Sequence, residues 1–119
     1  MTDYSRYECI KVEKADKLAT VTLNRPDSLN AINPQLHREL EHIWVDLAED
    51  TDTSAILLTG AGRAFCAGGD VKNMASRAGQ EEGRRRAMMT PAGARRLIQN
   101  MLEVEQPIIG AINGDAVGL

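Results

Sequence analysis

One arrangement occurs twice along this 119-residue chain and limits its fold more than any other feature. In each unit an amphipathic helix pattern leads to a short apolar run, then to a glycine-containing loop, then to the expected start of another helix. The apolar runs are residues 54–60 and 107–112, and the loops after them contain Gly68, Gly69 and Gly114. Strands that alternate with helices favour a parallel sheet. The layout therefore predicts an α/β fold.

Two short segments near the N-terminus hold β-branched residues. They are residues 9–13 and 18–23, and the polar residues 14–17 lie between them. β-branched side chains favour strands, and a short polar break between two such segments is typical of a hairpin. The sequence therefore predicts an antiparallel pair of strands before the first helix.

Each helix pattern begins with a capping signal. Asn33 precedes Pro34, and Thr90 precedes Pro91; a polar N-cap followed by proline at the first helical position is a common helix start. The first helix is expected to end near Glu49. Its apolar residues recur at spacings of three and four, namely Leu36, Leu40, Ile43, Trp44 and Leu47. The second helix carries its apolar face at Leu97, Ile98, Met101 and Leu102. Both patterns predict helices with one buried face.

The composition is ordinary for a globular protein, with 43% hydrophobic residues, 26% charged residues and a net charge of −3. This balance does not favour a nucleic acid or an anionic membrane as a partner. Residues 1–8 lack the features of a secretory signal, and no long apolar span is present. We therefore expect a cytoplasmic protein that binds neither nucleic acid nor membrane.

The cysteines and histidines give no signal for a metal or a nucleophile. Cys9 and Cys66 are far apart, so they form neither a disulfide framework nor a metal-binding pair. Cys66 has no histidine neighbour in sequence and is interpreted as a small buried residue. His37 and His42 are five positions apart on the first predicted helix and do not share one face. The sequence therefore predicts no metal site.

The two glycine-containing segments, residues 65–71 and 112–119, carry the chemistry. Each leaves an apolar run and reaches an expected helix start, where unpaired backbone N–H groups can point at an anion. Two such donors converging on one carbonyl oxygen would make an oxyanion hole. In the alternative interpretation, Gly68 and Gly69 only permit a tight turn between strand and helix.

A third segment, residues 23–31, reads Leu-Asn-Arg-Pro-Asp-Ser-Leu-Asn-Ala. The three segments in this order resemble the N-terminal half of the enoyl-CoA hydratase/isomerase (crotonase) superfamily, from about Tyr7 to Leu119. The resemblance implies a crotonase-like spiral of β-β-α turns, incomplete at the C-terminus because Leu119 lies inside the last segment. We expect one incomplete domain over residues 1–119, with an N-terminal tail at 1–6 and a flexible segment at 75–90.

The resemblance also implies which residues contact the substrate. The backbone N–H groups of Gly69 and Leu119 match the two donors of the oxyanion hole and are the expected catalytic positions. Ala31 matches a position whose main-chain carbonyl lies near the adenine of coenzyme A. Ala67 matches a position that lines the coenzyme A groove.

Basic side chains near these positions could approach the phosphates of the nucleotide. Arg63 and Lys72 stand at matching positions and Arg25 lies nearby, although for any one of them an ordinary solvated surface residue is the commoner outcome. Asp70 is interpreted as a helix N-cap rather than an acid or base. The expected substrate-binding positions are Ala31, Ala67, Gly69, Asp70, Val71, Lys72, Arg25 and Arg63.

The expected function is that of an acyl-CoA enzyme which stabilises a thioester enolate. We expect an enoyl-CoA hydratase of fatty-acid metabolism, which adds water to trans-2-enoyl-CoA to give 3-hydroxyacyl-CoA. Coenzyme A enters as part of the substrate, no other cofactor is expected, and family members are commonly trimers or hexamers. The acid/base carboxylates of family hydratases come after the second glycine segment, so no glutamate of this chain is assigned to that role.

Three alternatives remain open from the sequence. An isomerase, dehalogenase, hydrolase or decarboxylase of the same superfamily would carry the same segments. The chain could also be a truncated, catalytically inactive acyl-CoA-binding module. The third alternative is a protein unrelated to coenzyme A whose glycine loop arose by chance.

Overall fold

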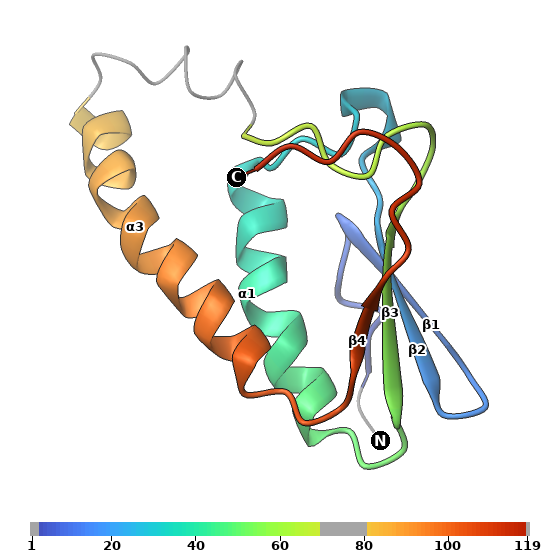
Figure 1. Cartoon of the computed structure of the whole chain (residues 1–119). Helices are drawn as coiled ribbons and strands as arrows, with labels where there is room; N and C mark the ends of the chain where they lie inside the picture. The colour runs from blue at the N-terminus through green and yellow to red at the C-terminus, as the bar shows by residue number, and fades with distance from the viewer. Residues whose placement is uncertain (1–2, 70–80, 119) are drawn as a thin grey trace.

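The computed structural model describes residues 3–69 and 81–118, and within residues 81–90 only the backbone. A four-stranded sheet packs against one helix, and a second helix lies on the other side of the first (Figure 1). The α/β prediction is therefore confirmed. No helix among the described residues is long and apolar enough to cross a membrane.

The strands follow their order in the sequence. They are β1 (Ile10–Ala15), β2 (Leu18–Leu23), β3 (Ala55–Gly60) and β4 (Ile108–Gly110). The β1–β2 pair is antiparallel, whereas β2, β3 and β4 run parallel to one another. Parallel neighbours need a crossover connection, which the two helices supply.

The predicted hairpin is present, but its turn is shorter than expected. Strand β1 continues to Ala15, which leaves only Asp16 and Lys17 as the turn. Both residues have positive φ, 51° and 68°. Two consecutive residues in this region match the right-handed twist of the flanking strands. The prediction of a polar break over residues 14–17 was wrong because Lys14 and Ala15 pair with Ala19 and Leu18 at the edge of the sheet.

Helix α1 (Pro34–Glu49) has the bounds that the sequence predicts. The side-chain oxygen of Asn33 accepts a hydrogen bond from the Leu36 N–H at 2.8 Å, which satisfies one unpaired donor of the first turn. All five apolar residues of the predicted face are buried, namely Leu36, Leu40, Ile43, Trp44 and Leu47. They form the centre of the core together with Ile10, Val21 and Ile56 from the sheet.

Helix α3 (Glu81–Leu102) begins ten residues before Pro91, the predicted first helical residue. That prediction was wrong because Pro91 lies inside the helix instead of at its first position. An internal proline removes one backbone hydrogen bond, but the good helix formers before it favour continuation. Of the segment expected to be flexible, residues 81–90 lie in α3 and residues 75–80 lie outside the described part.

Strand β4 and the segment after it carry an exposed apolar surface. Ile109, Ile112 and Val117 are 53%, 57% and 59% exposed. Ile108 differs, because it is partly buried and packs against the core. Leu119 lies outside the described residues.

Candidate functional site

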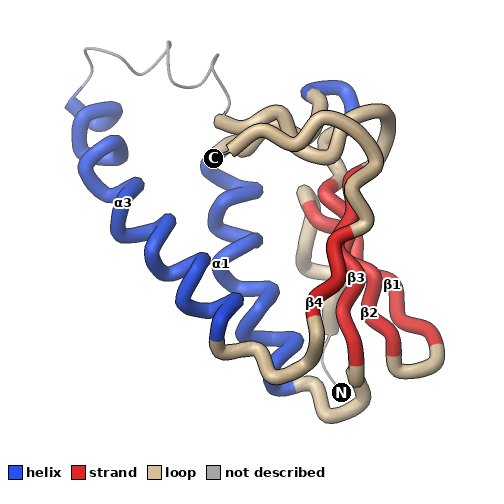
Figure 2. The backbone as a smooth tube through the Cα atoms, viewed as in Figure 1, coloured by secondary structure: helices blue, strands red, loops and turns tan. Residues whose placement is uncertain are grey.

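Three loops lie together beyond one end of the sheet (Figure 2). They are residues 24–33 after β2, residues 61–69 after β3 and residues 111–118 after β4. Because these three strands are parallel, their carboxyl ends meet at one edge, where ligands bind in open α/β sheets. We call this place the loop junction.

The loop of residues 65–69, called here the glycine loop, runs between the other two. On one side the Ala67 N–H donates to the Leu29 carbonyl at 3.0 Å, and the Ile32 N–H donates to the Gly68 carbonyl at 2.7 Å. On the other side the Val117 N–H donates to the Cys66 carbonyl at 2.8 Å. Backbone hydrogen bonds therefore hold all three predicted motifs together at one place.

Glycine is required where the backbones of these loops touch. A Cβ atom on Gly114 would lie 2.1 Å from the Arg63 carbonyl oxygen, a distance no side chain could accept. Gly68 has φ +93°, a conformation that other residues adopt only with strain. The glycines thus allow the close approach that builds the junction, whichever ligand it binds.

Two asparagines, Asn30 and Asn113, hold the loops of the junction together through their side chains. The fully buried Asn30 accepts a hydrogen bond from the Arg25 N–H and donates from Nδ2 to the carbonyls of Ala61 and Ala64, each at 2.9 Å. Asn113 accepts from the Gly60 N–H at 3.1 Å. Asn30 has φ 56°, a conformation that asparagine tolerates better than most residues. An asparagine inside a turn-forming segment was the available signal.

The predicted site residues divide into two groups. Among those described, Ala31, Ala67 and Gly69 are partly buried at the junction, where Ile32 and Gly69 form a parallel bridge. The guanidinium of Arg25 is turned inward and donates to the Ala31 carbonyl. Arg63 is exposed. The other predicted positions, Asp70, Val71, Lys72 and Leu119, lie outside the described residues, as does the predicted N-cap role of Asp70.

Both cysteines are buried free thiols. The Gly68 N–H points at the Cys66 sulfur at 3.4 Å, so this thiol accepts a weak hydrogen bond inside the glycine loop. The interpretation of Cys66 as a small buried residue is confirmed. Burial raises the pKa of the Cys9 thiol, which directly precedes β1 and whose carbonyl accepts a hydrogen bond from the Asn24 N–H at 2.8 Å. Within the described ranges no three potential ligands gather as a metal site.

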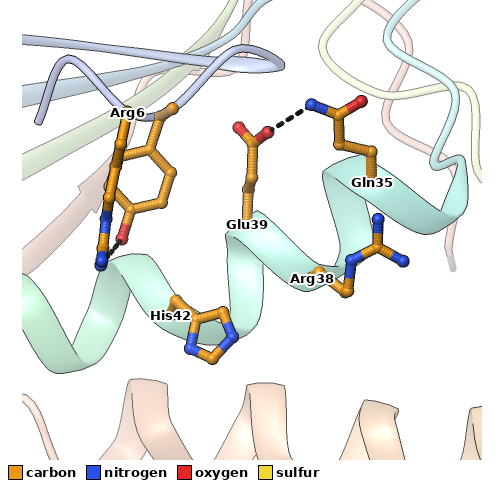
Figure 3. Close-up of a pocket in the computed structure, with 6 residues that line it drawn as sticks. Arg6, Gln35, Arg38, Glu39 and His42 are labelled. Atoms are coloured by element: carbon orange, nitrogen blue, oxygen red, sulfur yellow. Dashed lines mark hydrogen bonds between the residues drawn. The ribbon is translucent and has the colours of Figure 1, made fainter.

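A separate depression of about 330 Å³ lies between the N-terminal segment and α1. Its lining residues include Arg6, Gln35, Arg38, Glu39 and His42 (Figure 3). The carboxylate of Glu39 already has partners within the protein, because its Oε1 accepts hydrogen bonds from the consecutive N–H groups of residues 8, 9 and 10. None of the lining residues belongs to the loop junction, so this depression is not the candidate site.

The two histidines have different surroundings. His42 is exposed and lines this depression, whereas Nδ1 of His37 lies 3.2 Å from the buried carboxylate of Glu41. Glu41 also pairs with Arg96 of α3, at 2.9 Å. His37 therefore belongs to the contact between the two helices and not to a ligand set with His42.

Comparison with known proteins agrees with the three motifs. Residues 13–118 match the family described as enoyl-CoA hydratase/isomerase. The chain is 34% identical over 108 residues to the short-chain-enoyl-CoA hydratase of Clostridium acetobutylicum, a match covering 90% of this chain and 40% of that protein. It is also 34% identical over 109 residues to the 1,2-epoxyphenylacetyl-CoA isomerase of Escherichia coli, with the same two coverages of 90% and 40%.

A solved structure of an enoyl-CoA hydratase/isomerase from Mycobacterium paratuberculosis superposes with a TM-score of 0.82 at 36% identity. The match covers 93% of this chain and 43% of that one. The chain thus spans less than half the length of these relatives. Since the family match extends over nearly the whole chain and the fold agrees, the chain belongs to the enoyl-CoA hydratase/isomerase (crotonase) family.

Proposed function

We propose that the loop junction is part of an acyl-CoA site in which backbone N–H groups stabilise a thioester enolate. The single observation that carries this proposal is the position of Gly69. It forms a bridge with Ile32, in a glycine loop that is held on both sides by backbone hydrogen bonds. A donor on a fixed backbone needs little rearrangement when charge develops on the thioester oxygen.

The proposed chemistry needs two donors and a groove. The N–H of Gly69 donates to the thioester oxygen, and the N–H of Leu119 is the second donor. Negative charge that forms on this oxygen during the reaction is then shared between two hydrogen bonds, which lowers the barrier to the enolate. The groove for coenzyme A passes Ala31 and Ala67, with Asp70 and Val71 beside Gly69.

The charged end of coenzyme A is proposed to contact basic residues. We assign this contact to Lys72 and Arg63, because their side chains carry the positive charge that phosphates require. Because such pairs are exposed to water, each is worth about 1 kcal/mol or less. The proposed assembly is a homotrimer or homohexamer of the longer family protein.

The reaction proposed for the whole protein is hydration of trans-2-enoyl-CoA. A relative named as a hydratase supports this choice. Isomerisation of an acyl-CoA is the second candidate, because the relative named as a 1,2-epoxyphenylacetyl-CoA isomerase matches at the same 34% identity over 90% of this chain. The acid/base carboxylates that separate these reactions are not assigned to any residue of this chain. We therefore expect the 119-residue chain alone to bind thioesters without hydrating crotonyl-CoA.

The test is a titration of the isotopically labelled chain with acetyl-CoA and with the shorter acetyl-pantetheine. We expect the Gly69 amide resonance to shift with both and acetyl-CoA to bind more tightly. Lys72→Ala should reduce the difference in binding free energy between the two ligands by about 1 kcal/mol or less. Lys11→Ala, on β1, is the control and should not narrow it. Failure of both ligands to shift the Gly69 resonance would contradict the proposal.

A further inference from the structure

Arg25 makes more contacts within its own loop than a residue reserved for an external phosphate needs. Its guanidinium donates to the Ala31 carbonyl, and its main-chain carbonyl accepts hydrogen bonds from the N–H groups of Ser28 and Asn30, at 3.0 and 2.9 Å. Its own N–H donates to the Asn30 side chain at 2.8 Å. Both the backbone and the side chain of Arg25 thus close the loop of residues 25–31.

This closed loop is also the support of the glycine loop. The Leu29 carbonyl accepts a hydrogen bond from the Ala67 N–H. The Ile32 N–H, which follows Ala31 directly, donates a hydrogen bond to the Gly68 carbonyl. The Ala31 carbonyl that Arg25 binds belongs to the peptide unit that contains the Ile32 N–H. A guanidinium on that carbonyl fixes the peptide plane and so aims the N–H at Gly68.

We infer that Arg25 is a positioning residue that sets the place of the glycine loop, and through it of the Gly69 N–H, by holding the Ala31–Ile32 peptide. Its significance for catalysis rests on the proposed function, but the coupling between the two loops does not. A residue whose role is to bind a phosphate of the ligand needs chiefly positive charge, which lysine also supplies as a point charge. A positioning residue needs the forked guanidinium, which lysine does not replace.

The first test measures hydrogen exchange of single amides in Arg25→Ala and Arg25→Lys. We expect the protection of the Ala67 and Ile32 amides to fall about tenfold in both variants. The Ile56 amide, which donates to the Pro107 carbonyl at 2.9 Å at the opposite end of the sheet, should keep its protection. Arg38→Ala, an exposed arginine on α1, is the matched control and should leave all three unchanged.

The second test compares acetyl-CoA with acetyl-pantetheine, which carries none of the phosphates of coenzyme A. A positioning residue predicts that Arg25→Ala and Arg25→Lys weaken both ligands by the same factor and reduce the Gly69 resonance shift at saturation. If Arg25 instead binds a phosphate of the ligand, Arg25→Ala should weaken the binding of acetyl-CoA alone, and Arg25→Lys should preserve that binding. That second pattern, or unchanged exchange at Ala67 and Ile32 in Arg25→Lys, would overturn the inference. If the unaltered chain binds neither ligand, the proposed function fails while the exchange result still decides the coupling.

Discussion

A Cβ atom on Gly68 would lie 2.6 Å from the carbonyl oxygen of Gly118, so the glycine loop and the last described segment touch backbone to backbone. This contact lies beside the Val117–Cys66 hydrogen bond that joins the same two segments. The only side chain that fits at position 68 is therefore the hydrogen atom of glycine.

Gly68→Ala is expected to separate these segments. The substitution combines a backbone clash with an alanine at positive φ, and the conformational cost alone is about 1–2 kcal/mol. We expect the free energy of unfolding to fall by more than that, as measured by urea denaturation. Gly62→Ala, also at positive φ but 3.2 Å from a proline side-chain carbon, should show mainly the conformational part. Equal losses in the two variants would mean that the Gly118 contact is unimportant.

Asn30→Ala is expected to be among the most destabilising single changes outside the apolar core. It removes the partner of the Arg25 N–H and of the two carbonyls of Ala61 and Ala64. A buried polar group left without a partner costs about 1–3 kcal/mol. Asn30→Gly removes the same hydrogen bonds but relieves the strain of φ 56°, so it should be slightly less harmful. A loss below about 0.5 kcal/mol in Asn30→Ala would contradict the assigned role.

The carboxyl group of Asp50 makes the free energy of unfolding depend on pH in the acid range. Burial raises the pKa of its carboxyl, but hydrogen bonds from Lys14 and Tyr4, at 2.7 and 2.6 Å, together with that from the Asp52 N–H outweigh burial and lower it below the ordinary 3.8. A lowered pKa in the folded state gives stability that is present above pH 3.8 and lost as the pH falls further. Asp50→Asn should flatten this acid loss in pH-dependent unfolding curves. An unchanged acid slope would show that other carboxyls govern it.

The hydroxyl group of Tyr7 makes the free energy of unfolding depend on pH in the alkaline range. Burial, together with the hydrogen bond from its hydroxyl to Asp46, raises its pKa from 10.0 to about 12. A raised pKa gives stability that is present below pH 10.0 and lost as the pH rises toward about 12. Tyr7→Phe should reduce the fall in stability over that range. The measurement is unfolding followed by the fluorescence of Trp44, the single tryptophan of the chain, and an unchanged fall in stability in Tyr7→Phe would contradict this prediction.

The exposed apolar surface at β4 should cause self-association of the isolated chain. Ile109 and Ile112 are each more than half exposed, and apolar surface in water costs about 25 cal/mol per Å². Light scattering after chromatography should show oligomers whose share rises with concentration. The double variant Ile109→Lys and Ile112→Lys should suppress them, whereas Val45→Lys on α1 should not. A cooperatively unfolding monomer at all concentrations would contradict this prediction.

The elements with complete local signals were predictable. Asn33, Pro34 and the apolar spacing of α1 agree with one another, and the helix has the predicted bounds. The start of α3 was not predictable in the same way, because Thr90-Pro91 is a capping signal only when the preceding residues are not helical. The two-residue turn at Asp16 was missed because pairing at a sheet edge depends on partner strands rather than on composition.

The candidate site was predictable in location and less so in detail. The motifs with Gly69, Ala67 and Ala31 meet because parallel strands bring their carboxyl ends to one edge. The inward direction of Arg25 was not predictable, since an arginine in a loop serves a ligand or its own backbone equally well. The buried hydrogen bonds of Asn30 depend on a loop that lies far away in the sequence.

The carboxylate of Glu39, on α1, binds the backbone at the start of β1 from outside the sheet. Strand β1 has one buried side chain, Ile10, so its own apolar pattern does little to oppose a one-residue slip against β2. The carboxylate of Glu39 accepts from three consecutive N–H groups that end at Ile10, while the turn at Asp16 fixes the other end. A side chain of a helix thus helps to hold the alignment of a strand with which the helix forms no ladder, and Glu39→Ala would take the shared partner from the N–H groups of residues 8–10.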